Sequence, residues 1–132
     1  MARRERIDRN IQDLVYILNR ILEIKTYASC GGHVKPGDRK NPVPKGEFYV
    51  SFIYPLDVPE SFERSISVIN AAINVYNGKV VLEKDDFPPL KNGSSSWTIS
   101  GKGVNLRDFT DILLREYIIA KKIPARTDRA GE

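Results

Sequence analysis

The stretch from residue 26 to residue 47 holds the side chains of this sequence that are best suited to chemistry. It contains the only cysteine, Cys30, and the only histidine, His33, of the 132 residues. A thiol close to an imidazole can pair with it as nucleophile and base, so Ser29, Cys30 and His33 are candidate catalytic residues. A structural zinc site needs four ligands. One cysteine and one histidine supply only half of them, so no metal site is predicted.

Backbone amides in the same stretch favour a second kind of site, one that binds an anion. Two adjacent glycines allow consecutive N–H groups to form a concave nest, and basic side chains nearby would neutralise the bound charge. A phosphate, a nucleotide or an RNA backbone fits such a loop. The alternative is purely structural, a small buried cysteine at a helix end beside a loop histidine. The predicted anion-binding residues of this loop are Ser29, Gly31, Gly32, His33, Lys35, Arg39 and Lys40.

A second glycine-rich turn, Gly101-Lys102-Gly103, stands shortly before a predicted helix. Asn105, which follows it, is a residue type that caps helix N-termini. Amides and a lysine at a helix N-terminus can hold a phosphate, because the helix dipole also favours an anion there. The spacing is not that of a P-loop. Gly101, Lys102 and Gly103 are therefore predicted anion-binding residues, with an ordinary strand-to-helix turn as the alternative.

Two further groups of side chains have both a structural and a functional interpretation. Tyr49, Tyr54 and Trp97 would offer stacking surfaces to bases on an open sheet face, whereas aromatic residues on strands otherwise pack in the core. Three acidic residues between positions 83 and 86 could hold a hard cation or belong to a solvated loop.

Residues 27–33, Tyr-Ala-Ser-Cys-Gly-Gly-His, resemble a motif of the wybutosine-synthesising tRNA methyltransferases, which have a Ser-Ser-Cys-Ser-Gly-Arg run in a similar position. By this resemblance Ser29, Cys30 and Gly32 match motif positions. Three positions differ, since this chain has alanine, glycine and histidine where the family has serine, serine and arginine. The resemblance implies a small α/β protein that uses S-adenosylmethionine to methylate a guanosine derivative in phenylalanine tRNA.

Length and composition are those of a soluble domain with one core. The chain has 41% hydrophobic and 29% charged residues and a net charge of +4. No apolar run approaches the length of a membrane span, so no membrane partner is expected. A single cysteine cannot form an internal disulfide, which is typical of reducing compartments, and the expected localisation is cytoplasmic. Residues 26–47 carry four basic and two acidic side chains, whereas residues 48–101 carry four and six.

Hydrophobic periodicity and the positions of glycine and proline place the secondary structure. One domain is predicted over residues 1–124, and a flexible polar tail over 125–132. The predicted elements, in chain order, are a helix at 3–25, a loop at 26–46, a strand at 47–54, a helix at 59–77, strands at 79–83 and 95–100, and a helix at 105–122.

This order of elements predicts an α+β fold, a single-domain α-β-α-β-β-α sandwich that is ferredoxin-like in part and lacks the last strand of that fold. Helices would pack a small mixed sheet. Strands 47–54 and 79–83 would be parallel, joined by a right-handed crossover. Strand 95–100 would be antiparallel to strand 79–83.

The apolar stripe of helix 3–25 has two interpretations. Such a stripe is typical of a helix that packs on a core. Its spacing over about two heptads would also suit the seam of a homodimer. The residues of the stripe are Ile7, Ile11, Leu14, Leu18 and either Ile21 or Leu22.

Three functions are compatible with these residues. The first is a small basic intracellular domain that binds a phosphate-bearing ligand, RNA or a nucleotide, through the loop 26–47. The second is an S-adenosylmethionine-dependent tRNA-modifying enzyme, a methyltransferase by resemblance. The third is a non-catalytic structural or adaptor protein that forms oligomers through helix 3–25. Both catalysis and simple binding agree with the residue pattern.

Overall fold

Four strands and a layer of helices make up the part of the chain described by the computed structural model, which covers residues 8–32, 46–86, 88–90 and 92–122. The helices α1 (Gln12–Tyr16), η1 (Arg9–Ile11, a 3-10 turn) and η2 (Ile17–Ile21, a π-helical turn) are continuous, and together we call them the N-terminal helix. The other elements are β1 (Thr26–Cys30), β2 (Glu47–Tyr54), α2 (Glu60–Asn74), β3 (Val80–Lys84), β4 (Ser95–Lys102) and α3 (Leu106–Lys122).

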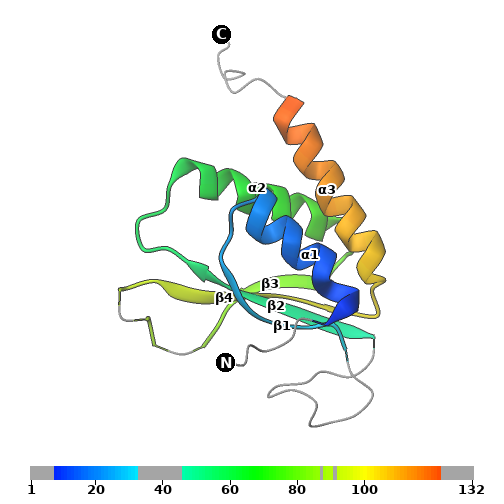
Figure 1. Ribbon diagram of the computed structural model, residues 1–132, viewed down its shortest axis with the longest axis horizontal. Helices are drawn as coiled ribbons and strands as arrows, with labels where there is room; N and C mark the ends of the chain where they lie inside the picture. The colour runs from blue at the N-terminus through cyan, green and yellow to red at the C-terminus, as the bar shows by residue number, and fades with distance from the viewer. Residues whose placement is uncertain (1–7, 33–45, 87, 91, 123–132) are drawn as a thin grey trace, which may run out of the picture.

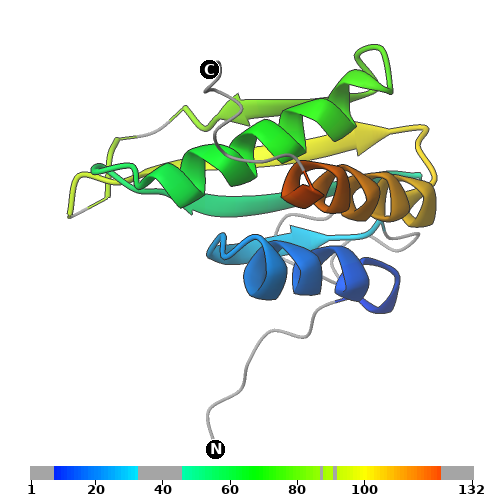
Figure 2. The same cartoon turned by 90° about the horizontal axis from the view of Figure 1, so that it is seen from above.

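The sheet has the strand order β1-β2-β4-β3, and every pair of neighbours is antiparallel (Figures 1 and 2). The predicted α+β class is confirmed, as is the antiparallel pairing of the strands predicted at 79–83 and 95–100. The prediction of a mixed sheet is wrong, because β4 lies between β2 and β3 and is antiparallel to both. β2 and β3 therefore run in the same direction without pairing. This is the split β-α-β arrangement of ferredoxin-like folds.

β1 occupies the edge position that the predicted fold left vacant. The prediction of a loop over 26–46 is wrong for Thr26–Cys30, which pairs with β2. The side chain of Asn19 holds the start of this strand, since its amide donates to Thr26 Oγ1 at 2.8 Å and its Oδ1 accepts from the Thr26 N–H at 3.0 Å. The strand shows no apolar alternation, so tertiary hydrogen bonds decide its conformation.

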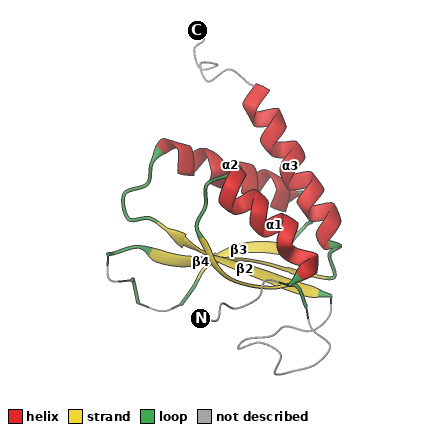
Figure 3. Cartoon of the chain, viewed as in Figure 1, coloured by secondary structure: helices red, strands yellow, loops and turns green. Residues whose placement is uncertain are grey.

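All helices lie on one face of the sheet, and the core lies between the two layers (Figure 3). Phe48, Val50 and Phe52 on β2 point into this core with at most 2% of their surface exposed. The ring of Phe48 packs against that of Phe109 on α3, with 5.8 Å between ring centroids. The face of β2 that carries Phe48, Val50 and Phe52 is thus the one that the helices cover.

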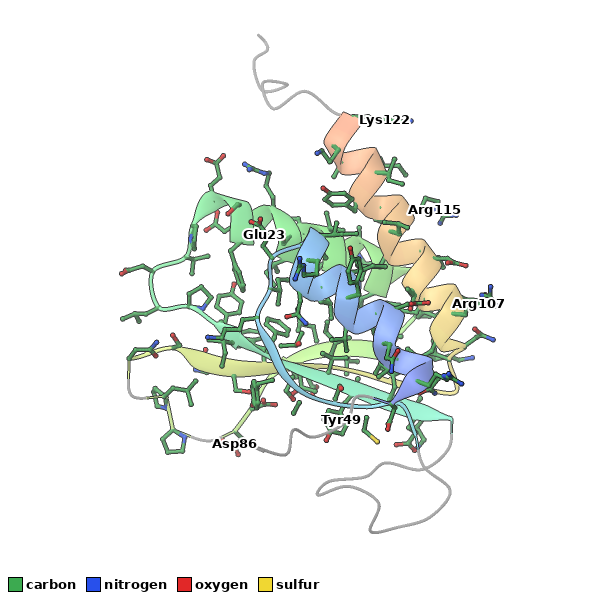
Figure 4. All side chains as sticks on the ribbon, in the orientation of Figure 1. Glu23, Tyr49, Asp86, Arg107, Arg115 and Lys122 are labelled. Atoms are coloured by element: carbon green, nitrogen blue, oxygen red, sulfur yellow. The ribbon has the colours of Figure 1, made fainter. Side chains whose placement is uncertain are left out.

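Two of the three aromatic residues considered for base stacking belong to the helix-covered face. Tyr54 packs edge-on against Phe62 of α2, with 4.9 Å between ring centroids, and Trp97 lies against Tyr54 at the same distance. These rings are used in packing. Tyr49 lies on the opposite face of the sheet (Figure 4).

The apolar stripe of the N-terminal helix is part of the same core. Ile11, Leu14 and Leu18 have no exposed surface. The core-packing interpretation is therefore confirmed, and these side chains are not available to a dimer seam. Of the large hydrophobic residues on the described part of this helix, Tyr16 is the exposed one.

The N-terminal helix ends at Ile21, so the predicted end at residue 25 is wrong. Glu23 has a left-handed φ of 57°, which turns the chain back toward the sheet. Ile24, 1% exposed, is buried in the core on the way to β1. Burial of this side chain ends the helix without a glycine or a proline. Residues 3–7 of the predicted helix lie outside the described residues.

The remaining predicted bounds need small corrections. The strand at 47–54 is as predicted, whereas α2 ends at Asn74 instead of residue 77. Asn77 has the left-handed conformation expected of a helix cap, with a φ of 51°. The predicted tail at 125–132 lies outside the described residues.

Candidate anion-binding site

Glycine-bearing segments that are distant in the sequence meet at one end of the sheet. Gly32 follows β1 and Gly46 precedes β2. The N–H of Gly103, just after β4, donates to the carbonyl oxygen of Gly46 at 2.9 Å. We call this region the sheet-end site, because it holds a cavity of about 340 Å³. The cavity is lined by Asn10, Gly31, Gly32, Gly46, Glu47, Phe48, Val104 and Leu106.

The peptide of Gly31 is held on both sides by the start of the N-terminal helix. Its N–H donates to Asp8 Oδ2 at 2.8 Å, and its carbonyl accepts from Asn10 Nδ2 at 2.8 Å. A Cβ atom at Gly31 would lie 1.9 Å from Asn10 Oδ1, so this approach requires glycine. The Gly31 amide is thus bound to an internal carboxylate, and it fixes the end of β1 instead of forming an open nest for an anion.

A second cavity, of about 610 Å³, adjoins the first along the start of α3. The two cavities share Asn10 and Leu106. Asn105 caps α3 as predicted, because its Oδ1 accepts from the Asp108 N–H at 3.0 Å. Arg107 projects from this helix end (Figure 4). The charged residues that line the second cavity are Arg9, Asp13, Arg107 and Asp111.

The three predicted anion-binding residues of the turn at 101–103 have different roles. Gly101 lies opposite Phe48 in the sheet and faces the core, where a Cβ would come within 2.3 Å of the Phe48 ring. Gly101 is therefore a packing residue. Lys102 lies opposite Glu47, and it is exposed together with Gly103 at the sheet-end site.

The candidate catalytic residues of β1 do not share a face of the sheet. Ser29 lies opposite Val50, which points into the core, and Cys30 lies opposite Tyr49, on the other face. Successive side chains of a strand point to opposite faces, so the strand separates the hydroxyl from the thiol. The Cys30 thiol is also fully buried. His33, Lys35, Arg39 and Lys40 lie outside the described residues.

A hydroxyl network on the face opposite the helices was not indicated by any sequence motif. The Asp85 carboxylate accepts hydrogen bonds from Ser96 Oγ and, at 2.7 Å, from Thr98 Oγ1. Because both hydroxyl protons are used in this way, Tyr27 must donate to Ser96, and Ser51 must donate to Thr98 at 2.7 Å. The network joins β1, β2 and β4 to the residue that follows β3.

Because of this network, the described acidic residues at 83–86 are not arranged as metal ligands. Both carboxylate oxygens of Asp85 accept hydroxyl hydrogen bonds. Within the described ranges, no group of three His, Cys, Asp or Glu side chains is gathered as a metal site would require. The signal that could have revealed the network is the polar alternation of Ser96, Thr98 and Ser100 on one face of β4.

Tyr76 carries the one buried side-chain polar atom in the described chain that has no hydrogen-bond partner, its hydroxyl. The ring packs on Phe109, with 5.7 Å between centroids. Burial raises the pKa of the Tyr76 phenol, the negative charge of Asp108 adds to this, and Arg115 opposes it. This residue lies after α2, and it does not line either cavity of the sheet-end region.

Comparison with known proteins identifies no relative of this chain: no family model, curated protein or solved structure matches it. The resemblance of residues 27–33 to the tRNA methyltransferases therefore stays a prediction that rests on those residues alone. None of the helices in the described residues has the length and apolar character needed to cross a membrane.

Proposed function

We propose that this protein binds a phosphate-bearing ligand, RNA in particular, at the sheet-end site. The observation that carries the proposal is the meeting of two separately predicted segments beside one cavity, where the Gly103 N–H donates to the carbonyl oxygen of Gly46. Gly32 and Gly46 both line it. The chain between them, residues 33–45, is rich in lysine and arginine. The residues that flank this stretch thus line the cavity, and Lys102 and Gly103 lie beside it.

The chemistry of the two cavities suits different parts of a nucleotide. Val104 and Leu106 give the first cavity an apolar wall, against which an unstacked base would lie. Arg9 and Arg107 line the second cavity and would pair with phosphate oxygens. Acidic residues line it too, so most of the affinity for a polyanion must come from the basic residues of 33–45 and from Lys102.

A salt-dependent binding titration tests this proposal. Fluorescence anisotropy with labelled tRNA and with a labelled single-stranded RNA would give the dissociation constant at several salt concentrations. Each phosphate neutralised by the protein contributes a slope of roughly −0.7 to −0.9 to log K against log salt. We expect a slope of about −3 or steeper if the basic residues of 33–45 and Lys102 all contact phosphates. Absence of binding, or binding without a salt slope, would refute the proposal.

Two lysines at opposite ends of the sheet provide a matched pair of variants. Lys102 and Lys84 are both exposed and end β4 and β3, but only Lys102 adjoins the sheet-end site. Lys102→Ala should weaken binding and reduce the salt slope by about 1. Lys84→Ala removes the same charge and should leave the slope unchanged. If the two variants weaken binding equally, RNA affinity depends only on the net charge of the protein and not on the sheet-end site.

A further inference from the structure

A groove lies among the ends of all three helices, at the opposite end of the helix layer from the sheet-end site. Its volume is about 530 Å³, within the range of sites for small organic ligands. We call it the helix-end groove. It is lined by Ile21, Leu22, Glu23, Ser61, Arg64, Ser65, Val68, Tyr117, Ala120 and Lys121.

The floor of the groove is apolar, and the Ser65 hydroxyl in it already has a hydrogen-bond partner. Leu22 and Val68 are nearly fully buried, and Tyr117 adds a half-buried ring. The Ser65 hydroxyl donates to the carbonyl oxygen of Leu22 at 2.8 Å. The floor thus offers an apolar surface, and recognition of a charged ligand must come from the rim.

The rim carries opposite charges on different walls. One wall is the end of the N-terminal helix, where Glu23 adds a carboxylate to the negative end of the helix dipole. The other walls carry Arg64, near the positive end of α2, and Lys121, near the end of α3. Arg64 also pairs with Glu60 at 3.3 Å, and the Lys121 ammonium lies 5.7 Å from the centre of the Tyr117 ring.

The wall that carries Glu23 has an unusual backbone. The turn before it is π-helical, with the Leu22 N–H donating to the Ile17 carbonyl at 2.9 Å. Glu23 itself has a φ of 57°, a conformation that favours glycine. π-helical turns and left-handed non-glycine residues recur at functional sites. Glutamate at this position keeps a carboxylate at the lip of the groove where glycine would fit the backbone better.

We propose that the helix-end groove binds a small zwitterion with an apolar body, the chemistry of a free apolar amino acid. Its ammonium group pairs with Glu23, its carboxylate pairs with Lys121 and Arg64, and its side chain lies on the apolar floor. Neither a fatty acid nor an apolar cation matches both walls. This proposal does not depend on RNA binding, since the two sites share no residue.

Calorimetry with L-phenylalanine and two blocked analogues tests the groove. N-acetyl-L-phenylalanine lacks the ammonium group, and L-phenylalaninamide lacks the carboxylate. We expect L-phenylalanine to bind, and each analogue to bind at least ~10-fold more weakly, because each loses a charge-assisted hydrogen bond. No heat from L-phenylalanine at millimolar concentration, or equal affinity for all three compounds, would overturn the proposal.

Variants of Glu23 separate binding from folding. Glu23→Gln should weaken L-phenylalanine ~10-fold and abolish its advantage over the acetylated analogue. Glu23→Gly should also lose binding, yet raise the midpoint of unfolding, because glycine relieves the left-handed backbone. Glu83→Gln, at an exposed position on β3, is the charge-matched control and should bind as wild type does. Unchanged binding by both Glu23 variants would show that the carboxylate does not recognise the ligand.

Discussion

Asp85 is the residue whose replacement tests the outer face of the sheet most directly. Its carboxylate accepts hydrogen bonds from the hydroxyl groups of Ser96 and Thr98. These hydroxyl groups in turn accept hydrogen bonds from Tyr27 and Ser51. Removing the carboxylate therefore takes away the final acceptor of two hydrogen-bond chains. Both chains reach across strands, so we expect the loss to appear as reduced stability of the whole sheet.

The magnitude follows from the number and kind of bonds. Each hydrogen bond to a charged acceptor contributes roughly 1.5–3 kcal/mol, so the two on Asp85 contribute at most about 6 kcal/mol. Asp85 is only half-buried, and water can replace part of each bond. We expect Asp85→Ala to reduce the free energy of unfolding by about 2–4 kcal/mol. Asp85→Asn keeps one acceptor oxygen and should cost about 1–2 kcal/mol.

Urea unfolding followed by the fluorescence of Trp97 measures these differences. Asp86→Ala is the matched control, because Asp86 is the adjacent carboxylate and is exposed (Figure 4). It should change stability by less than about 0.5 kcal/mol. Thr98→Val combined with Asp85→Ala should cost less than the sum of the single changes, since both remove the same bond. If Asp85→Ala is no more destabilising than Asp86→Ala, the network does not stabilise the fold.

Three further substitutions test the packing of single residues. Gly101→Ala places a methyl group 2.3 Å from the Phe48 ring and should reduce stability by about 1–3 kcal/mol in urea unfolding; an unchanged midpoint would show that the ring moves freely. Gly31→Ala should displace the Asn10 amide and reduce the free energy of unfolding by about 1 kcal/mol. Adding Asn10→Ala should then cause little further loss of stability, because both changes remove the same hydrogen bond, and additive losses would contradict this. Tyr76→Phe removes an unpartnered hydroxyl, so its stability at neutral pH should equal or exceed that of wild type. Because the pKa of Tyr76 is raised above its usual value of 10.0, the folded state holds this phenol neutral, so the free energy of unfolding does not change through this group below pH 10.0 and falls as the pH rises from 10.0 through the raised pKa. Unfolding curves at neutral and alkaline pH should therefore differ less for Tyr76→Phe, and an identical alkaline loss in both proteins would exclude this phenol as the cause.

Long periodic elements of this fold could be predicted from the sequence, and the topology of the sheet could not. The alternation of β2 and the stripe of α3 reflect burial on one face, which hydrophobic spacing reports directly. The position of β4 between β2 and β3 depends on which strand pairs with which. That pairing is set by contacts between distant residues, such as Gly101 beneath the ring of Phe48. No local pattern carries this information.

The candidate site was predicted in part, because glycine has more than one use. The sequence indicates correctly that residues 31–32 and 101–103 are special, since adjacent glycines mark close approach or unusual backbone. It does not tell a glycine that binds an anion from one that admits a neighbour. Gly31 admits Asn10, and Gly101 admits Phe48. Only the spatial neighbours decide between these interpretations.

The N-terminal helix controls the geometry of the strand that carries the Ser29–Gly32 motif. At its start, Asp8 and Asn10 hold the peptide of Gly31, and near its end Asn19 holds the backbone and hydroxyl of Thr26. β1 is therefore fixed at both ends by polar side chains of one helix, whose apolar side chains are fixed in the core. A shift of this helix would therefore move β1 and Gly31, and with them one wall of the sheet-end site. The helix thus sets the position of β1 and Gly31, a role that its hydrophobic stripe alone does not reveal.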